Sequence, residues 1–68
     1  MSDEAWTSLV SSVIAGVTKD PARRDYLLYE IMSSLRYELA MSLHYAGDDE
    51  SARKLLTDEL KELTGEKE

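Results

Sequence analysis

Apolar residues recur at intervals of three and four along most of this chain, the spacing that places side chains on one face of an α-helix. The first such row predicts an amphipathic helix over residues 4–18. Its opposite face is small and uncharged, with no charged residue between Glu4 and Lys19. Because solvated helix faces usually carry charge, this face favours close contact with another helix. The apolar row is Trp6, Leu9, Val10, Val13, Ile14 and Val17.

The middle of the chain predicts one long helix over residues 21–46. Asp20 supplies an N-cap, Pro21 suits the first helical position, and no later glycine or proline interrupts the segment. We expect the apolar row through Leu35 and Leu39 to be buried. Truncating either leucine to alanine should then lower the free energy of unfolding by about 2–5 kcal/mol. That row is Leu28, Met32, Leu35, Leu39, Leu43 and Ala46, and a second row beside it is Leu27, Ile31 and Ser34.

A third helix is predicted over residues 50–64. Asp48 or Asp49 supplies its N-cap, and Gly65 ends it before a frayed tail over residues 65–68. The connectors on either side of the long helix are short, which favours antiparallel packing of successive helices. The apolar stripe of this third helix is Ala52, Leu55, Leu56, Leu60 and Leu63.

The predicted fold class is therefore all-α, a single domain over residues 1–68 with three helices arranged as antiparallel hairpins around the long central one. A core this small is marginal alone, and the chain has no cysteine to reinforce it with a disulfide. We predict completion of the fold by homo-oligomerisation, with a dimer favoured, because a second copy would cover the second apolar row. The pattern leaves open whether the first helix packs on its own chain or on a neighbour.

The predicted interface combines apolar positions of the first two helices with tyrosines, which are enriched at interface hot spots. An unpaired carboxylate is strongly disfavoured in such an interface, so Ile31→Glu is expected to dissociate the oligomer. The predicted interface residues are Trp6, Val10, Val13, Leu27, Tyr29, Ile31 and Tyr37.

The formal net charge of −6 limits the classes of partner that the chain is expected to bind. Nucleic-acid phosphates demand Lys and Arg, so we expect no direct binding to nucleic acid. No apolar run approaches the roughly 20 residues that cross a membrane, and we expect no membrane partner. The acidic start of the chain differs from the basic start of a signal peptide, so the expected location is the cytoplasm.

Residues with catalytic or metal-binding chemistry are sparse. His44 is the only histidine, and it forms at most a pair with Asp48 one turn later, short of the three or four ligands of a zinc site. No spacing indicates a serine nucleophile with its base, and three dispersed glycines do not make a phosphate loop. We therefore expect no catalytic residues, no cofactor, no metal and no enzymatic activity.

The pattern W-x₂-L-G-x₂-Y, a turn and A-x₃-F has its positions filled here by Arg36, Leu39, Ala40 and Leu43 before the turn and by Ala52 and Leu56 after it. In this spacing the segment resembles part of a tetratricopeptide repeat. Arg36 stands where the family has a large aromatic residue, Glu59 stands where a small residue is usual, and the closing proline is absent. The match covers about a quarter of the chain, and we interpret it as convergent helix-turn-helix packing.

These features predict a small acidic, homo-oligomeric helical module for protein–protein interaction, serving as an adaptor, assembly factor or regulator with a further protein partner. The alternative is an acidic inhibitor or nucleic-acid-mimicking decoy, of phage or plasmid origin, that blocks a basic surface on a target enzyme. Carboxylates clustered on one face would favour the decoy. An even spread, with positive charges interspersed, favours the interaction module.

Overall fold

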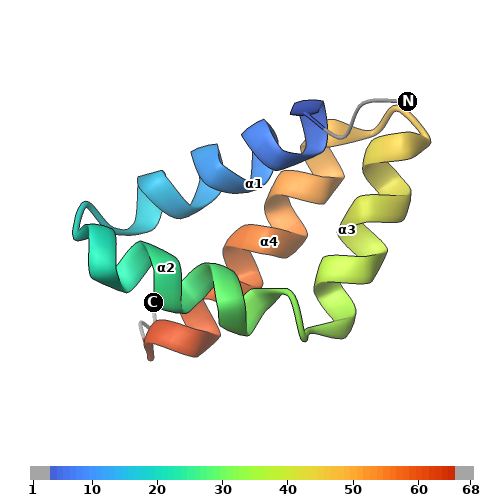
Figure 1. Ribbon diagram of the computed structural model, residues 1–68. Helices are drawn as coiled ribbons and strands as arrows, with labels where there is room; N and C mark the ends of the chain where they lie inside the picture. The colour runs from blue at the N-terminus through green and yellow to red at the C-terminus, as the bar shows by residue number, and fades with distance from the viewer. Residues whose placement is uncertain (1–3, 66–68) are drawn as a thin grey trace.

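The computed structural model describes residues 4–65, which form an all-helical fold of four helices (Figure 1). The predicted all-α class is confirmed, and the prediction of three helices is wrong. Helix α4 contacts each of the other three helices, so it is the central element of the fold in place of the predicted long helix. The helices are α1 (Glu4–Val17), α2 (Pro21–Ile31), α3 (Leu35–Tyr45) and α4 (Asp49–Thr64).

The predicted long helix is broken in its middle, where α2 ends at Ile31 and α3 begins at Leu35. Ser34 has an extended backbone, with φ −87° and ψ 144°, and its hydroxyl accepts a hydrogen bond from the backbone N–H of Arg36 at 3.0 Å. This is the conformation of an N-cap, in which a serine side chain replaces the missing intrahelical partner. Ser34 therefore starts a new helix and does not belong to an apolar row.

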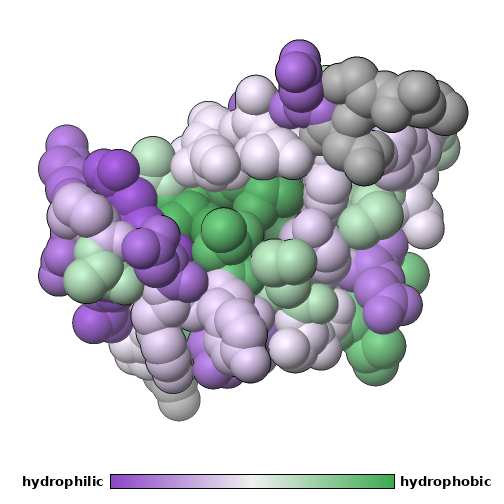
Figure 2. Space-filling model, in the orientation of Figure 1, coloured by the Kyte–Doolittle hydropathy of each residue, from purple (hydrophilic) through white to green (hydrophobic). Residues whose placement is uncertain are grey.

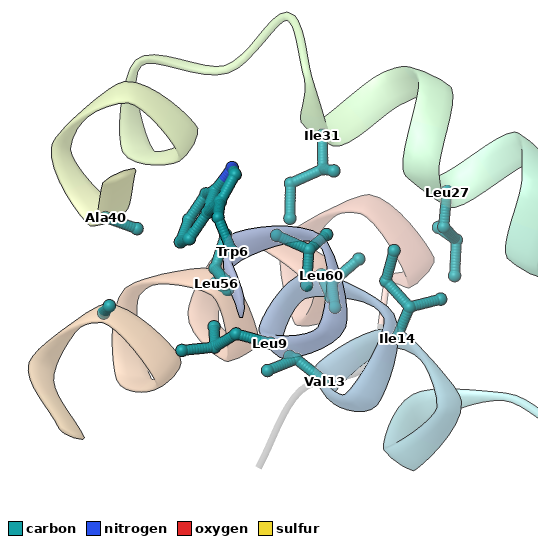
Figure 3. Packing of buried hydrophobic residues seen from close by; sticks show 11 residues of the cluster. Trp6, Leu9, Val13, Ile14, Leu27, Ile31, Ala40, Leu56 and Leu60 are labelled. Atoms are coloured by element: carbon teal, nitrogen blue, oxygen red, sulfur yellow. The ribbon is translucent and has the colours of Figure 1, made fainter. Parts of the chain in front are cut away.

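The break reverses which apolar row faces the core. Leu27 and Ile31 are 1% and 0% exposed, whereas Leu35 and Leu39, which were expected to be buried, are 78% and 57% exposed. A separate α3 turns Ala40 inward, and the core gathers side chains from all four helices (Figure 3). Its buried members are Trp6, Leu9, Val10, Val13, Ile14, Leu27, Ile31, Ala40, Ala52, Leu56 and Leu60.

One chain covers the apolar residues that were assigned to an interface between copies. The apolar face of α1 packs on α4 and α2 of its own chain, so α1 is not an arm that needs a neighbour. A single chain therefore covers Leu27 and Ile31 of the second row, contrary to the prediction that this needs a second copy. Ile31→Glu is now expected to unfold the chain. The interface residues that lie in this core are Trp6, Val10, Val13, Leu27 and Ile31.

Helices α3 and α4 form the most extensively packed pair, joined by a turn at Gly47 with φ +91°. Arg36 on α3 donates to Glu59 at 3.1 Å and lies 2.9 Å from a carboxylate oxygen of Glu62, both on α4. The two carboxylates, Glu62 most strongly, raise the pKa of Arg36. Arg36 and Glu59 are also two of the three departures from the tetratricopeptide pattern, and an ion pair links α3 and α4 at those positions.

The ends of α4 follow the predicted signals. Asp48 is its N-cap and accepts a hydrogen bond from the backbone N–H of Ser51 at 3.1 Å. Gly65 ends it in the left-handed region, with φ +76°. The rest of the tail predicted over residues 65–68 lies outside the described residues.

Candidate protein-interaction groove

Two adjoining cavities, of about 220 Å³ and about 300 Å³, form a groove between α1 and α2. Figure 2 shows it as a recessed hydrophobic area bordered by paler, more polar residues. We call it the α1–α2 groove. The first cavity is lined by Thr7, Val10, Ser11, Leu28, Met32 and Tyr37. The second is lined by Ser11, Ile14, Ala15, Arg24, Asp25 and Leu28.

The floor of the α1–α2 groove is apolar and belongs to the core. Val10 and Ile14 line it, and each is 3% exposed. Leu28 and Met32, one turn apart, form the α2 side of the groove and are 38% and 55% exposed. Long apolar side chains at such exposure beside an apolar floor offer a partner more contact area than isolated surface residues do.

The opposite wall of the groove is built from small side chains of α1. Thr7, Ser11 and Ala15 follow one another at intervals of four residues, and all three are exposed. Residues four apart lie above one another on a helix, so they form a straight row along the groove. None of them protrudes far, so the backbone of a bound helix can come close to α1 on this side.

Hydrogen bonds hold both ends of the α1–α2 groove. At one end, Tyr37 accepts a hydrogen bond from the indole N–H of Trp6 at 3.0 Å. At the other end, the Nε–H of Arg24 donates to the backbone carbonyl of Thr18 at 3.2 Å, across the turn that joins α1 to α2. The first contact joins α1 to α3, and the second joins the end of α1 to α2 across their connecting turn.

Charge is distributed unevenly over the surface. The α1 wall carries no charged side chain between Glu4 and Lys19, and Arg24 and Asp25 are the ionic residues that line the groove. A face of α4, by contrast, mixes both signs. Its charged residues are Glu50, Arg53, Lys54, Asp58 and Lys61.

The single histidine takes part in a structural cluster. His44 Nδ1 lies 2.6 Å from a carboxylate oxygen of Asp49, and not of Asp48 as the spacing suggested, because Asp48 caps α4. The imidazole ring lies against Trp6 with centroids 5.4 Å apart, and its side chain is 13% exposed. Within residues 4–65 no group of three His, Cys, Asp or Glu side chains is arranged to hold a metal ion.

The groove contains few of the residues that the sequence pattern assigned to an interface. Tyr37 lines it, Val10 forms part of its floor, and Tyr29 is 75% exposed on α2 without lining it. Leu28 and Met32 were missed because they were assigned to the buried row. The small uncharged face of α1, which the sequence predicts to contact another helix, is exposed in the single chain and forms the other wall of the groove.

Comparison with known proteins adds no functional information. No family model matches this chain, and no curated protein or solved structure matches it significantly. Within the part of the chain that the structure describes, no helix has the length and hydrophobicity to span a membrane.

Proposed function

We propose that this protein is a small helical module for protein–protein interaction, which binds through the α1–α2 groove and performs no catalysis of its own. The observation that supports this is the pairing of a recessed apolar floor with the exposed side chains of Leu28 and Met32. Exposed apolar surface of this kind, bordered by polar residues, is typical of interaction sites. An adaptor, assembly factor or regulator needs no further chemistry.

The dimensions of the groove fit a helix from the partner. From Thr7 to Ala15, the α1 wall extends about 12 Å at 1.5 Å per residue, which is about two helical turns. An amphipathic helix binds such a groove through apolar anchors spaced three and four residues apart. The one-turn spacing of Leu28 and Met32 matches that spacing. The partner we infer is therefore a helix that packs along the groove and covers Leu28 and Met32.

The charge pattern on α4 supports the interaction module over the decoy. A mimic of nucleic acid presents a continuous row of negative charge, because it replaces a phosphate backbone. On the α4 face, two carboxylates alternate with three basic side chains. This interspersed arrangement is the one expected for an ordinary solvated helix face.

The test is site-specific photo-cross-linking from the full chain in its native host. A photoreactive residue replaces Met32, the C-cap of α2, in the groove. The matched control replaces Tyr29, which is more exposed and lies on α2 outside the groove. We expect Met32 to cross-link a protein that Tyr29 does not. The purified partner should then bind the Leu28→Glu variant about tenfold or more weakly than the wild type.

Two results would overturn the proposal. One is equal cross-linking from the two positions. The other is unchanged affinity of the purified partner for Leu28→Glu when circular dichroism shows that the variant keeps its helical content.

A further inference from the structure

We propose that the occupant of the α1–α2 groove is a second copy of this chain, related by a two-fold axis that passes beside Ser11. This inference rests on the proposed role of the groove as an interaction surface and names its partner. In a two-fold pair each chain supplies the same patch, so α1 of one copy lies in the groove of the other.

The charge distribution favours this face for contact between identical chains. Each copy carries a net charge of −6, so two copies repel each other over most relative orientations. The α1 wall, which has no charged residue between Glu4 and Lys19, is where two copies meet without opposing like charges. A basic partner of unrelated sequence would be attracted by the net negative charge of the chain. Such a partner would not need an uncharged face to bind.

The two ends of α1 are also complementary in charge. Its start carries Glu4, whereas the segment 19–25 that follows it holds three cations and two carboxylates. An antiparallel crossing of two α1 helices brings the acidic end of one copy toward the net positive end of the other. A parallel crossing would bring ends of like sign together, so charge selects the antiparallel, two-fold arrangement.

The shape of the groove fits the same arrangement. The row Thr7, Ser11 and Ala15 is symmetric in spacing about Ser11, so a two-fold axis there places Thr7 beside Ala15 of the partner subunit. Small side chains on both helices allow a close approach. The approach covers Leu28 and Met32, which are exposed in the single chain.

The absence of cysteine from the sequence makes a direct geometric test possible. In Ser11→Cys the two-fold axis brings the thiols of both copies together, within the Cα separation of about 4.4–6.8 Å that a disulfide spans. The matched control is Ser12→Cys, which is also exposed on α1 but does not line the groove. Under mild oxidation at low micromolar concentration, Ser11→Cys should form covalent dimer about tenfold faster than Ser12→Cys. Equal rates would overturn the proposed axis.

Light scattering coupled to size exclusion provides the second measurement. Wild-type protein is expected to show the mass of two 7.7 kDa chains, and Leu28→Glu the mass of one chain with its helical content retained. A mass of one chain for the wild type across the whole dilution series would refute the second copy as occupant. In that case, cross-linking of a different protein from Met32 would still support the proposed function, whereas no cross-link would overturn both.

Discussion

The indole N–H of Trp6 donates a hydrogen bond to the phenolic oxygen of Tyr37 at 3.0 Å, and the two rings meet edge to face with centroids 5.3 Å apart. The contact joins α1 to α3 across 31 residues of sequence. Trp6 is 5% exposed, so its indole N–H has little access to water and depends on this acceptor. Tyr37 thus connects the core to one end of the α1–α2 groove.

Removing the hydroxyl of Tyr37 tests this relationship. Tyr37→Phe keeps the ring and leaves the indole N–H without its acceptor, so the free energy of unfolding should fall by about 1–3 kcal/mol. Urea unfolding followed by the fluorescence of the single tryptophan measures the change. The control, Tyr29→Phe, alters an exposed side chain and should stay within about 0.5 kcal/mol of the wild type. Equal stability of the two variants would show that the hydrogen bond contributes nothing.

The assignment of the inward and outward apolar rows is tested by two truncations on either side of the break. Ile31→Ala removes a side chain that is fully buried and should cost about 2–5 kcal/mol. Leu35→Ala removes one that is 78% exposed and should change stability by no more than about 0.5 kcal/mol. Chemical denaturation measures both. The reverse order would restore the single long helix predicted from the periodicity.

The break between α2 and α3 is tested by whether a substitution at Ser34 lowers or raises the stability of the chain. Changing the N-cap Ser34 to alanine should lower the free energy of unfolding by about 0.5–2 kcal/mol, and the amide hydrogen of Arg36 should exchange faster. Within a continuous helix the same change would stabilise the chain, because alanine is the better helix former. Ser33→Ala is the neighbouring control, since that side chain is exposed and does not cap α3. A stabilising Ser34→Ala would contradict the break.

Acid should weaken the start of α4 through Asp48. Hydrogen bonds from the side chain and backbone of Ser51 hold the pKa of Asp48 below its ordinary value of 3.8. A carboxylate whose pKa is lowered by folding stabilises the fold above its unfolded-state pKa and loses that contribution as the pH falls through the folded value. Asp48→Asn still caps the helix but does not titrate.

The measurement for Asp48 is the difference in unfolding free energy between wild type and Asp48→Asn, compared at about pH 7 and about pH 3. We expect the advantage of the wild type to shrink as the pH falls. A difference that does not change with pH would show that the carboxylate gains nothing from its charge in the folded state.

The sequence was sufficient for the features that local chemistry determines. Asp20 caps α2 and accepts from the backbone N–H of Ala22 at 3.1 Å, as the Asp-Pro pair indicated. Asp48 and Gly65 mark the ends of α4 as predicted. The apolar row of α1 is buried as far as Ile14, because one uninterrupted helix preserves its own periodicity.

The break between α2 and α3 was not predictable from the same signals. Serine is a weak helix breaker, and the spacing of Leu28, Met32, Leu35 and Leu39 continues across the turn as if the helix did not end. Which of two adjacent apolar rows faces inward is decided by packing against α4, a tertiary effect. Leu28 and Met32 line the α2 wall of the groove because the other row faces inward. The sequence therefore indicated only the small, uncharged side chains of the α1 wall.

The central claim is that this chain associates through the α1–α2 groove and not through other exposed apolar residues. Methyl NMR across a dilution series from millimolar to low micromolar concentration tests it most directly. The methyl groups of Leu28 and Met32 should shift with concentration, whereas those of Leu35 and Leu39, which are more exposed on average but lie outside the groove, should not. Constant shifts for Leu28 and Met32, or changes confined to Leu35 and Leu39, would contradict the claim.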